Sequence, residues 1–131
     1  MKILLGVLPK DFDVLKIDGL LHYSCLSDNL ELVELLIKRE PKLVFSTASD
    51  GKLAIHWVAR DGNTQILNLL LETIHLVDEN GWTPLHYAAA NNRVEAVQFL
   101  LSKGAKPDVP DKRGHTPQYY AKQKDWIIPG L

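Results

Sequence analysis

Three histidines recur along the chain at nearly regular intervals, at positions His22, His56 and His86. Imidazole nitrogens ligate metal ions, transfer protons or make hydrogen bonds, so such a series first suggests a metal site. A shared zinc ion needs each nitrogen about 2.0–2.1 Å away. Equivalent side chains on successive packed helices are separated by the helix-packing distance, roughly 8–10 Å. Histidines on stacked units would therefore not converge on one ion, and we expect neither a metal nor another cofactor.

Cys25 follows His22 by three residues, or one helical turn, so a thiol–imidazole pair is the second arrangement that could do chemistry. A nucleophilic cysteine also needs a lowered thiol pKa, a third group that orients the base, and an oxyanion site. The sequence marks neither of the last two. Cys25 aligns with Ala59 and Ala89, which favours a small, buried, packed residue. An enzyme that uses Cys25 and His22 is the minor alternative.

Other catalytic and binding patterns are absent from the sequence. It has no Gly-x-x-x-x-Gly-Lys-Ser/Thr loop for phosphate, no nucleophile elbow and no His-Glu-x-x-His helix. The formal net charge of −1 gives no strong field that would attract nucleic acid or an anionic membrane. We therefore expect no enzyme activity and no nucleic-acid, membrane or small-molecule partner.

The single cysteine and the opening residues bear on the compartment. One cysteine forms no internal disulfide, which fits a reducing compartment, the cytoplasm or nucleus. The apolar opening, residues 1–8, is too short to span a bilayer and is short for a secretory signal. We interpret it as a cover for the apolar flank of the first folded unit.

The elements that position these residues are clearest in residues 78–110. Thr83 is suited to cap a helix, and Pro84 falls at the first helical position, where its missing N–H has no cost. Apolar residues at helical spacing continue in a second segment, residues 94–101, and Gly104 stands where a left-handed C-cap is expected. Two short helices cannot bury both apolar faces alone, so this unit requires copies on either side.

Such copies are present in the sequence. Thirty-three residues after Gly81-x-Thr83-Pro84 comes Gly114-x-Thr116-Pro117. The segment Leu85-His86-Tyr87-Ala88-Ala89 has two earlier counterparts, Ile55-His56-Trp57-Val58-Ala59 and Leu21-His22-Tyr23-Ser24-Cys25. A period near 33 with the pattern Thr-Pro-Leu-His-x-Ala is the signature of ankyrin repeats. The chain therefore resembles an ankyrin-repeat protein over roughly residues 14–128.

The resemblance implies an all-α ankyrin-repeat solenoid of helix–turn–helix units, with three full repeats plus a C-terminal half-repeat cap. We expect the repeats at about residues 14–47, 48–77, 78–110 and 111–131, which together form the ankyrin-repeat domain 14–131. Residues 1–13 are interpreted as an N-terminal cap segment, with a remnant of an upstream repeat as the alternative. The second repeat is three residues shorter than the third, so we expect a tighter loop between Glu72 and Asp78.

The turn inside each unit provides an independent test of this register. Aligning the units on the histidine position places four residues directly after the first helix: Asp28, Gly62, Asn92 and Asp125. These residue types tolerate the left-handed backbone that such a turn often needs. The alignment therefore predicts a positive φ at all four positions.

The family also suggests roles for the repeated aromatic positions. Its histidine ties each repeat to the neighbouring loop by hydrogen bonds, which the resemblance implies for His22, His56 and His86, with Tyr119 at that position in the fourth unit. The next residue is aromatic in every unit: Tyr23, Trp57, Tyr87 and Tyr120. Packing between repeats is the favoured interpretation of this aromatic series, and a strip that receives a partner is the alternative.

Non-catalytic binding of another protein is the function that the resemblance implies, on the concave face formed by the turn tips and first helices. The candidate partner-binding residues on that face are Asp50, Lys52, Arg60, Glu79, Asn80, Trp82, Asn91, Lys112, Arg113 and His115. Trp82 stands out because tryptophan dominates many interfaces. The alternative for Trp82 is that it lies flat along its turn and packs against its neighbours.

A second interpretation of the function is an adaptor or assembly chaperone that holds a folded subunit of a larger complex. The Trp57-Val58-Ala59 and Tyr87-Ala88-Ala89 segments are loosely similar to those of small proteasome-assembly ankyrin chaperones. Those proteins carry more repeats than the sequence shows here.

Overall fold

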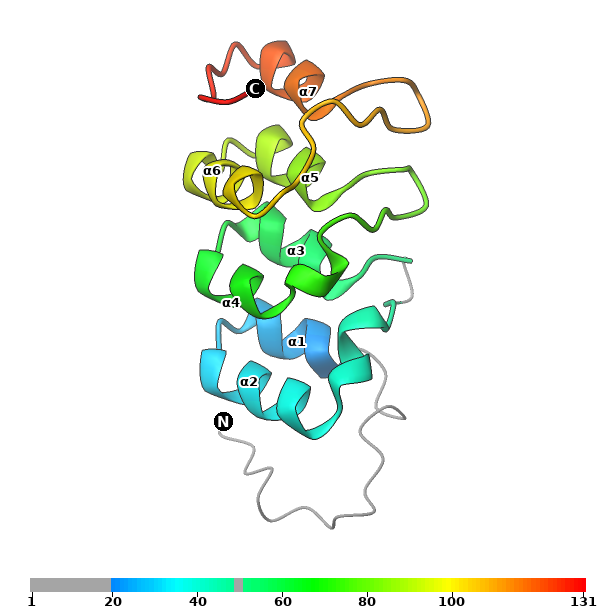
Figure 1. The fold of residues 1–131 in the computed structure, drawn as a ribbon, viewed down its shortest axis with the longest axis vertical. Coiled ribbons are helices and arrows are strands. Elements are labelled where there is room, and N and C mark those ends of the chain that lie inside the picture. The colour runs from blue at the N-terminus through cyan, green and yellow to red at the C-terminus, as the bar shows by residue number, and fades with distance from the viewer. Residues whose placement is uncertain (1–19, 49–50) are drawn as a thin grey trace.

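The computed structural model describes residues 20–48 and 51–131, so the expected cap segment 1–13 and Asp50 lie outside the described residues. Helix pairs stack along one axis, in chain order from one end to the other (Figure 1). The helices are α1 (Leu20–Leu26), α2 (Leu30–Arg39), α3 (Ala54–Asp61), α4 (Thr64–Leu69), α5 (Pro84–Ala90), α6 (Val94–Ser102) and α7 (Pro117–Gln123). The first helices α1, α3, α5 and α7 form one row and the second helices α2, α4 and α6 another. This arrangement confirms the expected all-α solenoid.

Strand structure in the described residues is limited to an isolated bridge between Thr47 and Leu53. No helix in this part of the chain is both long and apolar enough to cross a membrane.

Two short 3₁₀ helices follow the second helices of the first two units, at Pro41–Phe45 (η3) and Leu71–Thr73 (η4). The apolar residues Ile66, Leu67, Leu69, Leu70 and Leu71 predict one second helix in this unit. This is wrong at its end, because α4 ends at Leu69 and a 3₁₀ turn follows. A 3₁₀ helix rises about 2.0 Å per residue against about 1.5 Å in an α-helix. It therefore covers the distance to the third unit with fewer residues, as the shortened linker requires.

Capping residues in the sequence determine where the first helices of the units begin. The Thr83 hydroxyl accepts a hydrogen bond from the His86 N–H at 3.3 Å, and Pro84 occupies the first helical position. The sequence predicts both features. In the second unit Leu53 takes the cap position and makes no side-chain cap, but its N–H donates to Nδ1 of His56 at 3.0 Å. The imidazole thus satisfies a backbone donor at the start of the helix.

The turn residues predicted from the alignment all have a left-handed backbone. The φ angles are 53° at Asp28, 85° at Gly62, 55° at Asn92 and 57° at Asp125. Gly104 follows α6 with φ of 97°, as expected for a left-handed C-terminal residue. The register of the repeats is therefore confirmed at positions that did not define it.

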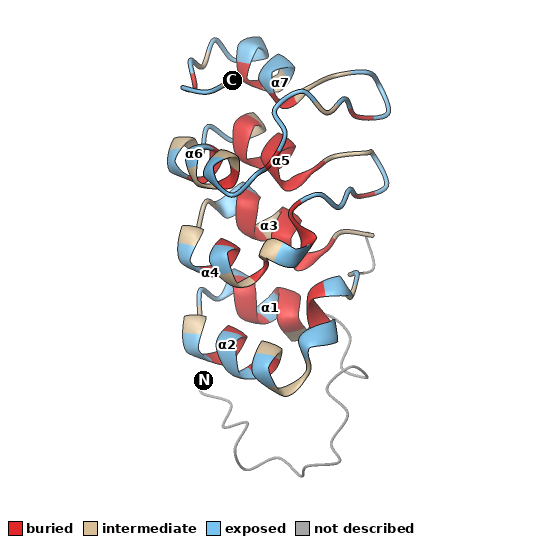
Figure 2. Cartoon of the chain, in the orientation of Figure 1, coloured by how far each residue is buried: buried red, intermediate tan, exposed pale blue. Residues whose placement is uncertain are grey.

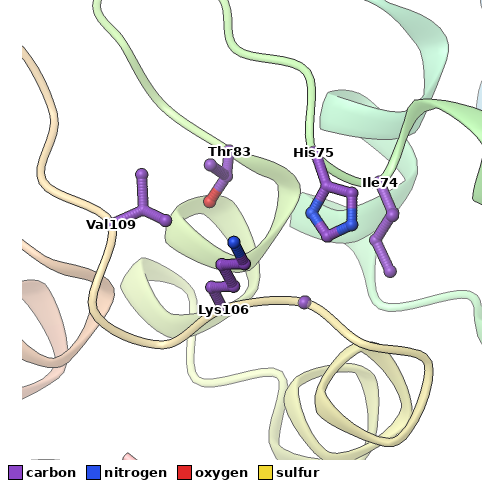
Figure 3. A pocket seen from close by; sticks show the side chains of 6 residues that line it. Ile74, His75, Thr83, Lys106 and Val109 are labelled. Atoms are coloured by element: carbon purple, nitrogen blue, oxygen red, sulfur yellow. The ribbon is translucent and has the colours of Figure 1, made fainter.

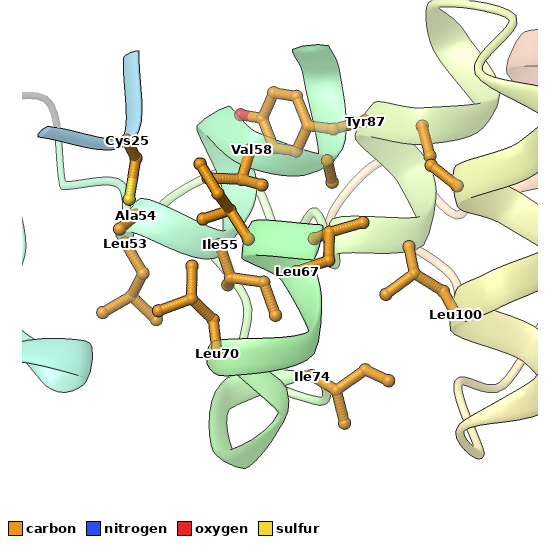
Figure 4. Close-up of a cluster of buried hydrophobic side chains, with 14 of the residues drawn as sticks. Cys25, Leu53, Ala54, Ile55, Val58, Leu67, Leu70, Ile74, Tyr87 and Leu100 are labelled. Carbon is orange, nitrogen blue, oxygen red and sulfur yellow. The ribbon is translucent and has the colours of Figure 1, made fainter. Parts of the chain in front are cut away.

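The apolar core continues without interruption from one unit to the next, and the first helices α1, α3, α5 and α7 carry a larger share of it than the second helices do (Figure 2). Leu21, Ile55 and Leu85 occupy equivalent positions and are at most 1% exposed. Ala59 and Ala89 are fully buried, and Cys25 fills the equivalent place in the first unit (Figure 4). Small residues at this position let neighbouring helices approach closely, so the units share one core.

The chain after α7 takes the place of a second helix in the fourth unit. Ile128 is 4% exposed, and Trp126 and Leu131 pack partly against the same core. Gly130 has φ of 95°, and a Cβ at that position would lie 2.7 Å from Cδ1 of Leu101 in α6. The tail therefore folds back and packs against α6, as expected for a half-repeat.

Replacing Ile128 with alanine is expected to lower the free energy of unfolding by about 2–4 kcal/mol, because it removes a buried branched side chain from the cap. The neighbouring Ile127 is 93% exposed, so Ile127→Ala should change stability by no more than about 0.5 kcal/mol. Urea unfolding followed by circular dichroism measures both variants. Equal losses in the two variants would contradict the placement of the tail.

Candidate functional site

Three turns precede the first helices α3, α5 and α7 and project from the same side of the stack (Figure 1). We name them finger 2 (residues 48 and 51–53 of those described), finger 3 (residues 78–83) and finger 4 (residues 111–116). Each is closed by the same backbone hydrogen bond: Ala48 N–H to Lys52 O at 3.0 Å, Asp78 N–H to Trp82 O at 3.1 Å, and Asp111 N–H to His115 O at 2.8 Å. A glycine of positive φ lies inside each turn, at Gly51, Gly81 and Gly114. Fingers 3 and 4 and the described residues of finger 2 thus share one pattern of backbone hydrogen bonds.

Fingers 3 and 4 are also joined to each other. The Lys112 N–H donates to the Asn80 carbonyl at 3.1 Å. A Cβ on Gly81 would lie 2.9 Å from the Lys112 nitrogen, which is closer than real Cβ contacts. Glycine is therefore required at position 81 both for its φ of 77° and for the close approach of the next finger.

Each repeated histidine makes the hydrogen bond that the resemblance implied. The contacts run from Nε2 to a backbone carbonyl of the next linker or finger: His22 to Lys52 at 2.8 Å, His56 to Leu76 at 3.0 Å, and His86 to His115 at 3.0 Å. In His86, Nδ1 accepts from the Thr83 N–H at 3.1 Å, so the proton lies on Nε2, which donates to the carbonyl. His22 and His86 therefore connect their helices to the following finger, whereas His56 binds the linker at the end of its own unit.

Burial keeps two of these imidazoles neutral. Desolvation lowers the pKa of His56 and of His86, and it outweighs the hydrogen bonds to the Leu76 and His115 carbonyls, which act in the opposite direction. With both nitrogens of these rings in hydrogen bonds, neither has a lone pair available for a metal. The described residues contain no group of three or more His, Cys, Asp or Glu side chains that could hold one.

Two buried aspartates hold fingers 3 and 4 in shape. Oδ1 of Asp78 accepts from the N–H groups of Asn80 at 2.9 Å and Trp82 at 3.0 Å, while Oδ2 accepts from the Tyr87 hydroxyl. Burial alone would raise the pKa of Asp78, but hydrogen bonds from Tyr87, Trp82 and Asn80 outweigh it and lower the pKa.

Asp111 repeats this network and extends it to the previous finger. Oδ1 accepts from the N–H groups of Arg113 and His115, both at 2.9 Å. Oδ2 accepts from the Tyr120 hydroxyl and from Nε1 of Trp82 at 2.9 Å. Burial acts to raise the pKa of Asp111, but the four hydrogen bonds prevail and lower it to about 2. The sequence prediction missed both aspartates, although each precedes a finger glycine by three residues and a tyrosine follows each by nine.

Trp82 packs along its finger. Its ring stacks on His86 with centroids 5.7 Å apart, meets Tyr87 at 4.8 Å, and meets Tyr120 of the next unit at 4.6 Å. The ring is half-buried, and its Nε1–H is bound to Asp111. Of the two predicted roles, packing against neighbours is therefore observed, and the exposed part of the ring remains a candidate contact.

The aromatic series forms contacts between repeats through the histidines. His22 meets Trp57 at 5.4 Å, His56 meets Tyr87 at 5.6 Å, and His86 meets Tyr120 at 6.1 Å. Each imidazole thus lies against the aromatic side chain of the following unit. Tyr23, which has no described unit before it, is 69% exposed.

Finger 2 lacks the aspartate network. Ala48 occupies the position of Asp78 and Asp111, and Trp57 occupies the position of Tyr87 and Tyr120. The Nε1–H of Trp57 is buried and has no hydrogen-bond partner among the described residues. Both the aspartate and the tyrosine of the network are therefore replaced in this unit. The buried Nε1–H of Trp57 is left without the carboxylate that fingers 3 and 4 supply.

The environment of Cys25 argues against nucleophilic chemistry. Its side chain is 2% exposed and lies in the apolar core (Figure 4). Burial, and to a lesser extent the charge of Asp28, raises the pKa of the thiol to about 12, so it stays protonated. The Nε2 of His22 is bound to the Lys52 carbonyl.

The predicted partner-binding residues fall into three groups. Exposed side chains belong to Arg60, Glu79, Asn80, Asn91, Lys112 and Arg113, half-buried ones to Lys52, Trp82 and His115, and Asp50 is not described. The finger residues come together along one edge of the stack. Arg60 and Asn91 lie instead at the far ends of α3 and α5.

Two cavities lie beside the fingers. One, of about 230 Å³, opens between fingers 3 and 4, and Asn80, Trp82, Asp111, Lys112, Arg113 and Tyr120 line it. The other, of about 210 Å³, lies between the segments that follow α4 and α6. The side chains of His75, Lys106 and Val109 are among those that line it (Figure 3).

Comparison with known proteins identifies the family. A family model of ankyrin repeats in three copies matches residues 21–111, which is more than half of the chain. The chain belongs to the ankyrin-repeat family. Ankyrin repeats are generally protein-interaction modules.

Three relatives illustrate the range of ankyrin-repeat proteins that the chain resembles. The probable 26S proteasome regulatory subunit p28 of Saccharomyces cerevisiae is 29% identical, over 82% of this chain and 50% of that protein. The putative ankyrin repeat protein FPV022 of fowlpox virus is 34% identical, over 82% of this chain and 18% of that protein. Protein phosphatase 1 regulatory subunit 27 of Mus musculus is 32% identical, over 68% of this chain and 60% of that protein. The chain thus spans half or less of the first two.

The Asp111 network makes the ankyrin stack sensitive to acid. Because the folded pKa of about 2 lies below the ordinary value of 3.8, Asp111 stabilises the fold above about pH 4, and this contribution is lost as the pH falls towards 2. Asp111→Asn should lower the stability at pH 7 and reduce the loss between pH 4 and pH 2, as measured by urea unfolding. Asp108→Asn, at an exposed position, is the control. If Asp111→Asn lost as much stability between pH 4 and pH 2 as the wild type does, this role of the carboxylate would be contradicted.

Ala48→Asp is expected to stabilise the protein by roughly 1–3 kcal/mol, because a carboxylate at this position can accept from the buried Nε1–H of Trp57. The effect should disappear in a Trp57→Phe background, which keeps an aromatic ring without the donor. Chemical unfolding of the two single variants and the double variant gives the coupling energy. A coupling near zero would show that position 48 does not face this donor.

Proposed function

We propose that this protein is a non-catalytic recognition module that binds another protein on the face formed by fingers 2 to 4 and the exposed side of α3, α5 and α7. One observation carries the proposal: exposed charged and polar side chains stand on fingers whose backbones are held by buried hydrogen bonds. Glu79, Asn80, Lys112 and Arg113 are exposed, while Asp78 and Asp111 beneath them are buried. A surface ordered before binding loses little conformational entropy on association, which favours affinity.

The groups that could do chemistry are engaged in the fold, which supports a non-catalytic role. His56 and His86 use both ring nitrogens in hydrogen bonds, and the thiol of Cys25 is buried and protonated. Nucleophilic catalysis needs an accessible nucleophile with a base in reach, and these residues do not provide that combination.

A second candidate function is that of an adaptor or assembly chaperone for one subunit of a larger complex. The similarity to a probable proteasome regulatory subunit and to a phosphatase regulatory subunit favours it, since both names describe proteins that act within assemblies. In this case the partner would be a folded subunit, and native capture would return a single multi-subunit complex. A simple recognition module would return individual proteins instead.

The proposal is tested with a triple variant that changes one exposed residue in each of repeats two to four: Arg60→Glu, Asn91→Lys and Arg113→Glu. Partners are first captured from native cells and identified, and their affinity for the purified wild-type and variant proteins is then measured. Loss of charge complementarity and close contact at three places should weaken binding at least about tenfold.

The matched control makes the same three charge changes on the second helices and their ends, at exposed Lys38→Glu, Asn68→Lys and Lys103→Glu. It should bind as the wild type does. If the first triple variant kept both the affinity and the melting temperature of the wild type, the face formed by the fingers and the exposed side of α3, α5 and α7 would not be the binding surface.

A further inference from the structure

The cavity between fingers 3 and 4 has an aromatic floor without free donors. The rings of Trp82 and Tyr120 lie 4.6 Å apart at an interplanar angle of 51°. The Nε1–H of Trp82 and the hydroxyl of Tyr120 both donate to Oδ2 of Asp111. The floor therefore offers ring surface for apolar contact, and its polar atoms are already satisfied.

The rim of the same cavity is cationic. Lys112 and Arg113 are exposed, and no carboxylate of the described residues forms an ion pair with either side chain. Asp111 is the carboxylate that lines the cavity, so the three charged groups sum to one positive charge. This balance suits a ligand group with a single negative charge.

The backbone N–H groups of finger 4 are already bonded, which favours a carboxylate over a phosphate as the anion bound here. Phosphate sites commonly use several free backbone N–H groups in a turn. Here the N–H of Lys112 is bound to Asn80, and those of Arg113, Gly114 and His115 are all bound to Asp111. The cationic side chains of Lys112 and Arg113 are therefore the charged groups that can hold an anion here.

The size of the cavity limits the ligand further. Its volume of about 230 Å³ is below the roughly 300–1,000 Å³ of pockets that enclose small molecules. It has room for one or two side chains that enter from the finger face. The dimensions thus favour part of a polypeptide over a free metabolite.

We propose that this cavity binds a glutamate or aspartate side chain, with an adjacent apolar residue, from an acidic segment of the partner protein. The carboxylate pairs with Lys112 and Arg113 on the rim, and the apolar neighbour lies on Trp82 and Tyr120. This inference rests on the proposed recognition function and specifies the chemistry of its partner.

The test uses a display library of random linear peptides selected on the immobilised full chain. Selected sequences should contain Glu or Asp next to an apolar residue. Each selected peptide is then synthesised with Glu, with Gln and with phosphoserine at the acidic position, and binding is measured by fluorescence anisotropy. The Glu form should bind at least about tenfold more tightly than the Gln form, and phosphoserine should give no further gain.

Charge reversal assigns the binding to this cavity. The double variant Lys112→Glu/Arg113→Glu should lose at least about tenfold in affinity for the Glu peptide, while Lys122→Glu/Lys124→Glu, two exposed cations outside the cavity lining, should lose little. Raising the ionic strength from about 0.01 M to about 1 M shortens the screening length from about 30 Å to about 3 Å and should weaken the interaction.

Several outcomes would overturn the inference. These are enrichment of neutral or basic peptides, tighter binding of the phosphoserine form, unchanged affinity in the Lys112→Glu/Arg113→Glu variant, or no enrichment at all. The triple variant, which shares only Arg113 with the cavity lining, tests the recognition function with a captured native partner in place of peptides. A partner that depends on the finger face while acidic peptides fail would separate the two proposals.

Discussion

The hydrogen bond from a buried histidine to the backbone of the next linker or finger is the interaction on which the stacking of the units depends. In the third unit the imidazole of His86 is fully buried, receives the Thr83 N–H on one side and donates to the His115 carbonyl on the other. Losing such a bond would leave a buried polar group unsatisfied, at a cost of about 1–3 kcal/mol. Because the acceptor belongs to the next unit, the bond couples the start of one helix to the backbone of the next finger.

Hydrogen bonds of the buried aspartates are a second interaction that joins neighbouring fingers, and they are present in fingers 3 and 4 but not in finger 2. Asp111 binds its own finger and also Trp82 of finger 3, so fingers 3 and 4 form one hydrogen-bonded body. Finger 2 has Ala48 at the equivalent position and an unpaired buried donor on Trp57. The stack therefore has its most extensive polar network where the aromatic cavity lies, and a simpler finger nearer the first unit.

Much of the fold could be predicted because its determinants are local and repeat. The cap at Thr83, the proline after it and the left-handed residue at Asn92 each follow from a few neighbouring residues. The bond from Trp82 to Asp111 could not be predicted because it joins residues 29 positions apart. The other donors to the two aspartates lie within nine residues of them, so their repeated spacing was a signal that the sequence prediction missed. For the same reason the sequence favours a partner contact for Trp82, since its bond to Asp111 is visible only in three dimensions. The early end of α4 at Leu69 reflects linker length, which overrides the apolar spacing of the sequence.

The division between buried and exposed residues explains how one scaffold can recognise a particular partner. Buried positions repeat from unit to unit, as Leu21, Ile55 and Leu85 do, whereas equivalent finger tips carry Glu79 in one unit and Lys112 in the next. Neighbouring repeats lie roughly 8–10 Å apart, close to the screening length of about 8 Å at physiological salt. On the face proposed for recognition, a partner would therefore meet these opposite charges as separate sites rather than as an average. Docking in the reversed direction would oppose like charges, and this repulsion would give the proposed face a preferred orientation in addition to affinity.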